Sequence, residues 1–115
     1  MTDVEIINSE IYHPSNFYSK ILTKNGTQNG KPTFLSRKEN QNIVIRWSLI
    51  HGGWTISGET SQTEIVRFIS RSDVSSPVDV ISWIYLPNGT INEMVAAPLM
   101  YVNGKYSATI GYASV

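Results

Sequence analysis

Alternating apolar and polar residues divide most of this chain into short strands. The clearest case is residues 42–50, where Arg46 and Ser48 stand between apolar neighbours. The apolar side of this segment consists of Ile43, Ile45, Trp47 and Leu49. A two-residue period is typical of a strand with one face against a core and the other toward solvent. The His-Gly-Gly sequence at 51–53 then predicts a turn into a second strand that starts at Trp54.

Two further segments have apolar residues on both faces. Residues 78–86 alternate valine, isoleucine, tryptophan and tyrosine with few polar positions, which predicts a central strand covered on both sides. Residues 63–70 predict another strand, although their length without a breaker also allows a short helix. Between these segments lie the Ser-Ser-Pro sequence at 75–77 and, after 78–86, a Pro-Asn-Gly-Thr sequence that predicts a tight turn at 87–90.

The C-terminal region predicts a broken strand and a final complete one. Residues 91–96 and 99–102 flank Pro98, and proline confines such a strand to an edge or a bulge because it lacks a backbone donor. The Asn-Gly pair at 103–104 predicts a turn, because both residues tolerate positive φ. An alternating strand is then expected over 105–112.

The N-terminal region is more polar. Residues 3–7 and 17–23 are candidate strands, whereas 24–33 carries two Asn-Gly pairs and 36–42 is a charged loop. We therefore expect residues 1–40 to be an arm or a set of long loops attached to core strands in 41–115.

Composition supports an all-β fold. Ile, Val and Thr total 32 residues, against 12 for Leu, Ala and Met. β-branched side chains fit a pleated sheet and lose rotamer freedom in a helix. Short strands with frequent turns, in a chain of 115 residues, predict one antiparallel β-sandwich domain.

Charge and cysteine content exclude several classes of protein. Nine basic and nine acidic residues give no net charge, which removes the usual electrostatic case for nucleic acid or an anionic membrane. No apolar run approaches the length of a membrane span, and the acidic start lacks the features of a signal peptide. Without cysteine the chain forms no disulfide and no thiolate metal site.

Candidate catalytic chemistry is sparse. The two histidines, His13 and His51, have no second ligand at metal-binding spacing, and no nucleophile elbow or phosphate-binding loop is present. The carboxylates of the second half are scattered, although two of them could meet in space as a glycosidase pair. These carboxylates are Glu59, Glu64, Asp73 and Asp79. We expect no enzymatic activity, no cofactor and no metal.

Aromatic residues offer a second class of function. Trp47 and Trp83 are expected in the core, whereas Trp54, beside a glycine turn, is either a core residue or an exposed platform for a sugar ring. Tyr101, which precedes Asn103, is the other candidate for sugar binding. A lectin-like or receptor-binding module would use loops at one end of the sandwich, at 51–54, 71–77 and 87–90.

The C-terminal third resembles a known kind of domain. The sequence Leu-Pro-Asn-Gly-Thr at 86–90, followed by Gly-Lys-Tyr-Ser-Ala-Thr at 104–109, is similar to the end of immunoglobulin-like modules in phage virion and bacterial surface proteins. The resemblance implies that Tyr106 is a corner tyrosine whose hydroxyl returns to nearby backbone. Such modules have one more strand after this point. Here either the N-terminal segment supplies that strand or the sheet keeps an open edge that a neighbouring chain can join.

These observations together favour a structural protein. We expect a non-enzymatic assembly subunit, namely a small immunoglobulin-like phage virion component that is assembled in the host bacterial cytoplasm. It would dock on other protein subunits, as a homo- or hetero-oligomer, through residues 1–40 and the edge near 99–102. The alternative is a carbohydrate- or receptor-binding module.

Overall fold

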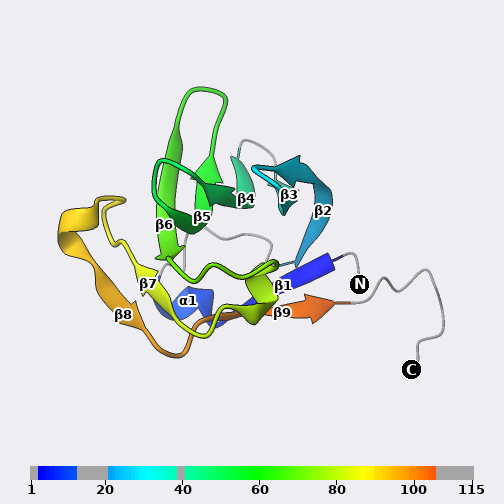
Figure 1. Ribbon diagram of the computed structural model, residues 1–115. Helices are drawn as coiled ribbons and strands as arrows, with labels where there is room; N and C mark the ends of the chain where they lie inside the picture. The colour runs from blue at the N-terminus through cyan, green and yellow to red at the C-terminus, as the bar shows by residue number, and fades with distance from the viewer. Residues whose placement is uncertain (1–2, 13–20, 39–40, 106–115) are drawn as a thin grey trace.

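The computed structural model describes residues 3–12, 21–38 and 41–105, and strands dominate them (Figure 1). The strands are β1 (Asp3–Ile7), β2 (Ile21–Gln28), β3 (Lys31–Lys38), β4 (Gln41–Ser48), β5 (Gly53–Glu59), β6 (Glu64–Ser70), β7 (Trp83–Tyr85), β8 (Val95–Ala97) and β9 (Tyr101–Lys105). One short α-helix, α1 (Ser9–Tyr12), and two 3₁₀-helices, η1 (Pro77–Asp79) and η2 (Ile91–Glu93), complete the described elements. The all-β prediction is confirmed.

All nine strands of the described region belong to one sheet, in the order β8-β7-β6-β5-β4-β3-β2-β1-β9. Every neighbouring pair is antiparallel. Strands β8 and β9 lie at opposite edges, yet only residues 98–100 connect them. A flat sheet of this width would separate its edges by about 40 Å, whereas three linking residues reach no more than about 14 Å. The sheet must therefore curl until its two edges meet.

The segment that follows β1 holds this meeting point together. The Asn8 side-chain amide donates to the Leu99 carbonyl at 2.7 Å, and the Leu99 N–H donates to the Tyr12 hydroxyl at 3.3 Å. The Tyr12 ring packs against Phe68 and Tyr85, with centroids 6.2 and 5.6 Å away. Helix α1 thus fixes the link between β8 and β9 to the core. Strand β9 also contacts η1.

The core fills the inside of the curled sheet. Alternate residues of β1 and β4 point inward and are almost completely buried, as period-two strands require. Strands β5 and β6 are buried on both faces over much of their length, and Val66 and Ile69 of β6 form a second apolar cluster with Leu86. The inward set of largest buried side chains includes Ile6, Ile43, Ile45, Trp54, Ile56 and Phe68. Trp83 and Met100 join this core from β7 and from the link between the edge strands.

Several N-terminal predictions are wrong. Strand β1 lies inside the sheet between β2 and β9, and β2 and β3 form a hairpin over residues predicted as a polar loop. The N-terminal arm is therefore not supported. The predicted charged loop at 36–42 is shorter than expected, because β3 continues to Lys38 and β4 begins at Gln41. The turn of this hairpin uses Asn29 at φ 56° and Gly30 at φ 81°, as an Asn-Gly pair allows.

Three other predictions also need correction. The segment 78–86 is not one central strand, because η1 occupies its start and only Trp83–Tyr85 pairs, one place from the sheet edge. The Asn-Gly pair at 103–104 lies within β9 rather than in a turn. Leu49 lies outside the core, in the turn between β4 and β5, and is 71% exposed.

Other predictions are confirmed. Residues 64–70 form a strand rather than a helix, and Pro98 does lie between two edge strands, although residues 91–93 of the predicted strand form η2. The turn at 87–90 closes with a hydrogen bond from the Gly89 N–H to the Leu86 carbonyl at 3.0 Å. The described strands make one sheet, so the two separate sheets of an immunoglobulin-like sandwich are not confirmed.

Candidate functional site

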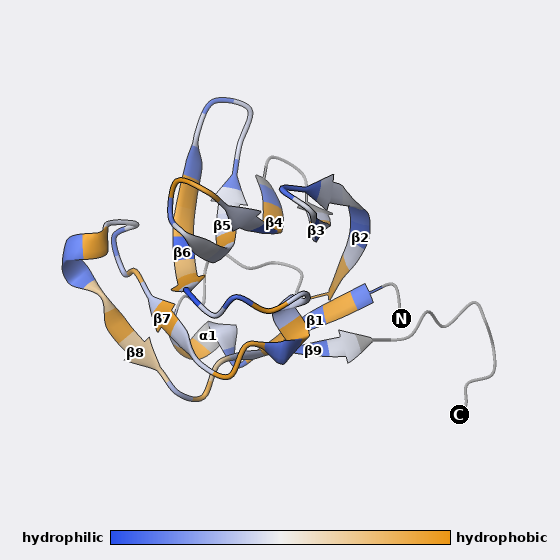
Figure 2. Cartoon of the chain, in the orientation of Figure 1, coloured by the Kyte–Doolittle hydropathy of each residue, from blue (hydrophilic) through white to orange (hydrophobic). Residues whose placement is uncertain are grey.

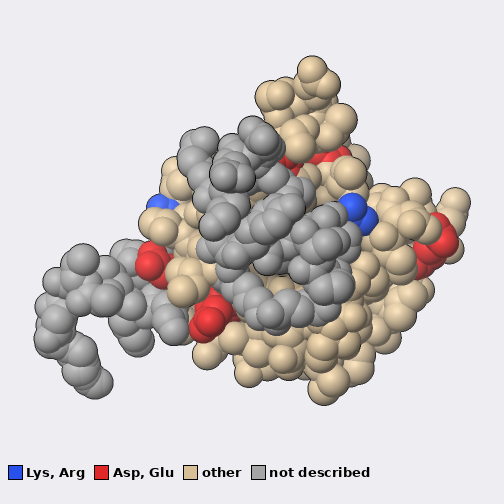
Figure 3. Space-filling model, turned by 180° about the vertical axis from the view of Figure 1, so that it is seen from behind, with Lys and Arg blue, Asp and Glu red and all other residues tan. Residues whose placement is uncertain are grey.

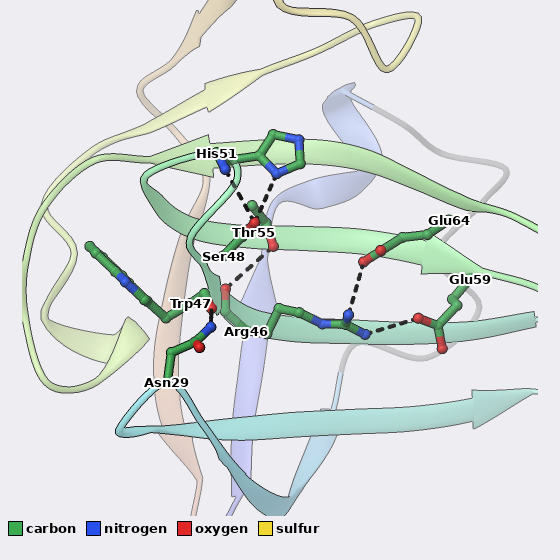
Figure 4. Close-up of polar contacts among 8 residues, drawn as sticks. All are labelled: Asn29, Arg46, Trp47, Ser48, His51, Thr55, Glu59 and Glu64. Carbon is green, nitrogen blue, oxygen red and sulfur yellow. Dashed lines mark hydrogen bonds and ion pairs between the residues drawn. The ribbon is translucent and has the colours of Figure 1, made fainter.

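The outer face of the sheet, opposite the core, carries an arginine held between two carboxylates. Arg46 lies on β4 between the inward-facing Ile45 and Trp47 and so points outward. Its Nη2 atom lies 2.9 Å from Glu59 Oε2, and its Nη1 atom lies 3.6 Å from Glu64 Oε2. Figure 4 shows the guanidinium extended along the strands toward these carboxylates, which stand at the two ends of the β5–β6 turn.

A hollow of about 310 Å³ opens beside this arginine, and we call it the Arg46 hollow. Its lining comes from the end of β2, the β2–β3 and β4–β5 turns, and strands β4, β5 and β6. It consists of Gln28, Asn29, Arg46, Ser48, Leu49, Ile50, His51, Thr55, Glu64 and Val66. A smaller hollow of about 210 Å³ lies on the other side of Arg46, toward Asn25 and Asn42. Arg46 and Gln28 border both hollows.

Hydrogen bonds fix the walls of the Arg46 hollow. Ser48 Oγ lies 2.9 Å from His51 Nδ1, the Thr55 hydroxyl donates to the Arg46 carbonyl at 3.3 Å, and Asn29 Nδ2 donates to the Trp47 carbonyl at 2.9 Å. Two of these contacts tie side chains to strand backbone (Figure 4). These contacts therefore tie the turn residues Asn29 and His51 to β4.

The turn between β4 and β5 borders the same hollow with exposed aliphatic side chains. Leu49 and Ile50 are 71% and 93% exposed. We call residues 49–52 the hairpin tip, and Figure 2 shows a hydrophobic part in the loop that joins the two strands, next to a hydrophilic part. Only Gly52 in this turn has a positive φ, of 68°. Residues 49 and 50 have ordinary negative φ angles that any residue can adopt, so the shape of the turn does not explain why both side chains are large and apolar.

The three tryptophans all belong to the core region. Trp54 is fully buried and its Nε1 atom donates to the Val74 carbonyl at 3.0 Å. A sugar needs an exposed ring face, so Trp54 is not a stacking platform and its core interpretation holds. Trp83 is buried, and Trp47 packs edge-on against Trp54 with the Lys31 ammonium 4.6 Å from its ring centroid.

The other predicted sugar-binding residues are exposed together. Tyr101 and Asn103 are two residues apart on β9 and share one face of this edge strand. Their Cα partners on β1 are Ile7 and Glu5. Tyr106, predicted as a corner tyrosine, lies outside the described residues, as does His13.

Of the three loops predicted to form one binding end, 51–54 and 71–77 lie together, but the turn 87–90 lies elsewhere. The loop 71–77 follows the end of β6 and is bonded to Trp54 and Lys31 through the Val74 carbonyl. The turn 87–90 lies beside Ile65 at the start of β6, because a Cβ added at Gly89 would lie 2.7 Å from that side chain. The hairpin tip and this turn are therefore separated along β6.

Three of the four scattered carboxylates lie against basic partners. Glu59 and Glu64 come together, but on either side of Arg46, and Asp73 pairs with Lys31 at 2.8 Å. The described residues bring no three His, Cys, Asp or Glu side chains into an arrangement that could hold a metal ion. In the view from behind, the charged side chains are few and of both signs (Figure 3).

The sequence alone did not indicate the Arg46 hollow. Arg46 and Ser48 are recognisable as the polar face of a strand, but the pattern does not show which residues lie opposite them. Within the described residues, no helix has the length and apolar character needed to cross a membrane. Comparison with family models, with curated proteins and with solved structures finds no match.

Proposed function

We propose that this protein is a non-enzymatic assembly subunit that docks on other protein subunits through the hairpin tip. The observation that carries the proposal is the exposure of Leu49 and Ile50, side by side at the end of a hairpin. Single exposed apolar residues are ordinary, whereas adjacent large ones on a protruding turn are typical of contact surfaces.

The energetics favour a partner that covers this tip. Burying one leucine or isoleucine side chain contributes about 1.5–3 kcal/mol, so the pair would contribute several kilocalories per mole to docking. The Arg46 hollow beside the tip adds hydrogen-bonding groups around the apolar centre. An apolar centre with a polar rim is the common organisation of protein interfaces.

The finer assignment, an immunoglobulin-like phage virion component assembled in a bacterial cytoplasm, rests on the resemblance in the C-terminal third. The turn at 87–90 forms as that resemblance implies, with Gly89 at φ 73°. The second part of the resemblance, at 104–109, lies almost entirely outside the described residues. The single curled sheet gives this finer assignment no added support.

The mass of the protein in solution tests docking between copies. Light scattering behind a sizing column would be recorded over a range of concentrations, for the wild type and for the double variant Leu49→Ser/Ile50→Ser. We expect a wild-type mass above the 12.9 kDa of one chain, and a lower mass in the variant. Ile81→Ser is the matched control, because Ile81 is as exposed as Ile50 but lies before β7. An equal loss of mass in both variants would contradict docking at the tip.

Carbohydrate binding is the second candidate function. It is favoured by Tyr101 and Asn103, because an exposed ring beside an amide offers stacking and hydrogen bonding on one face. A glycan array compares the wild type with Tyr101→Ala. Another tyrosine near this end of the sheet, Tyr12, packs against Phe68 and Tyr85, so Tyr12→Ala would disturb the core and is not a suitable control. Loss of a wild-type glycan signal in Tyr101→Ala supports this candidate, whereas an array without any signal counts against it.

A further inference from the structure

Docking through the hairpin tip leaves the chemistry of the Arg46 hollow unexplained. Several groups in its lining have hydrogen-bonding capacity that the described residues do not use. The Gln28 amide has no described partner, His51 uses only Nδ1, and Glu64 meets Arg46 at 3.6 Å, which is too long for a hydrogen bond. Amide and imidazole groups can both donate and accept, and the carboxylate accepts.

Two buried polar atoms on this face also lack a partner among the described residues. They are Arg46 Nε, at the border of both hollows, and Ser57 Oγ on the neighbouring strand. Ser57 pairs with Val44, two residues before Arg46, so both side chains lie on the outer face. A buried donor without an acceptor is costly, but both atoms are closed off from the hollow, so a ligand there would meet the accessible groups of its lining instead.

The charged residues and the aliphatic side chains that line the hollow together indicate which class of ligand it can bind. One guanidinium stands between two carboxylates, which disfavours an anion. The described residues offer no metal-binding cluster here. Leu49, Ile50 and Val66 supply an aliphatic wall for C–H groups. A volume of about 310 Å³ is at the lower end of the range for small-molecule sites, so the ligand must be small.

We infer that the Arg46 hollow binds a neutral, hydroxyl-rich ligand of the size of one sugar residue. Hydroxyl groups both donate and accept, which matches the mixed lining, and the C–H face of a sugar ring fits the aliphatic wall. The inference takes the ligand class of the second proposed function but not its site: it names a separate site, on the outer face of β4–β6, in place of the Tyr101 and Asn103 surface of β9. It does not depend on docking through the tip.

Amide chemical shifts of the ¹⁵N-labelled full chain test the inference. The probes are the methyl glycosides of glucose, galactose, mannose and N-acetylglucosamine, each titrated into the millimolar range, with cadaverine as a cationic probe. We expect at least one glycoside to shift the amides of Arg46, Thr55 and Glu64. Gln28→Ala and Glu64→Gln should each weaken that binding by about tenfold, as expected for loss of one good hydrogen bond to a ligand.

A matched variant separates the hollow from a general loss of charge. Glu93→Gln makes the same chemical change on η2, outside the hollow, and should leave the affinity unchanged. Circular dichroism and thermal unfolding check that each variant remains folded.

Three results would overturn the inference. Shifts confined to Tyr101, Asn103 and their neighbours would keep carbohydrate binding but remove it from the hollow. No shift with any glycoside would reject both the hollow and a simple sugar ligand, without affecting docking. Tighter binding of cadaverine than of every glycoside would show that the hollow selects a cation.

Discussion

Two adjacent glycines in the β4–β5 hairpin should respond very differently to substitution by alanine. A Cβ at Gly53 would lie 2.1 Å from the Ser70 carbonyl oxygen and 2.8 Å from its carbon, both of which are backbone atoms. Ordinary contact begins near 3.4 Å, so β5 and β6 would have to separate by about 1.3 Å at this point. A Cβ at Gly52, in contrast, would meet open space, but the backbone there has a φ of 68°.

The two causes have different magnitudes. Forcing strands apart in a packed sheet costs about 1–3 kcal/mol, and a weakened backbone hydrogen bond adds about 1 kcal/mol, so Gly53→Ala should lose about 2–4 kcal/mol of unfolding free energy. An alanine at positive φ costs about 1–2 kcal/mol, which is the expected loss for Gly52→Ala. Asparagine tolerates that conformation, so Gly52→Asn should lose less still.

Urea unfolding measures these differences. With a slope of about 1.5 kcal/mol per molar, the midpoint should fall by about 1.3–2.7 M in Gly53→Ala and by about 0.7–1.3 M in Gly52→Ala. Equal midpoints in these two variants, or a Gly53→Ala midpoint close to the wild type, would refute the close approach of β5 and β6.

Three other variants test the packing and the tip. Trp54→Phe should lose about 1–2 kcal/mol in urea unfolding, because it removes the indole donor to a loop carbonyl and leaves unfilled volume; an unchanged midpoint would contradict the buried position. Tyr12→Phe removes the hydroxyl that accepts from the Leu99 N–H and should lower the unfolding free energy by about 1 kcal/mol. Faster hydrogen exchange of the amides between β8 and β9 would be the specific sign of this loss. Leu49→Ser/Ile50→Ser should change the unfolding free energy by less than about 0.5 kcal/mol, since both side chains are exposed; a larger loss would show that the tip supports the fold.

The strands with a buried face were predictable from the sequence. In β1 and β4 the inward side chains are apolar, so the two-residue period of the sequence matches the buried face of the strand. Strand β6 is apolar on both faces, which is why its sequence also allowed a helix. The hairpin of β2 and β3 was not predictable, for the opposite reason. Within β2 only Leu22 is buried, and the strand is held by its neighbours on both sides rather than by an apolar face. Polar strands of this kind leave no hydrophobic period to read.

The segment 78–86 shows how local capping overrides an apolar pattern. The Ser76 side chain accepts a hydrogen bond from the Val78 N–H, and Pro77 starts a 3₁₀ turn. The Ser-Ser-Pro sequence predicts a break, but not that the break extends into the residues after it. Ile81, which falls within the predicted strand, is therefore exposed.

The candidate site could not be derived from sequence spacing. Its members come from several strands and two turns, and their meeting depends on sheet order and register, which a two-residue period does not specify. The exposure of the hairpin tip could not be predicted either. Leu49 continues the apolar–polar alternation of β4, although the strand ends at Ser48.

Photo-crosslinking from the tip tests the docking proposal most directly. A benzophenone amino acid would replace Ile50 in one variant and Gln62, at the exposed turn between β5 and β6, in the other. Both variants would be irradiated in the cells or particles that contain the protein, and the products analysed by mass spectrometry. We predict one discrete protein adduct from position 50, either a second copy or another subunit, that is absent from position 62. No adduct from position 50, or the same adducts from both positions, would contradict a docking surface at the hairpin tip.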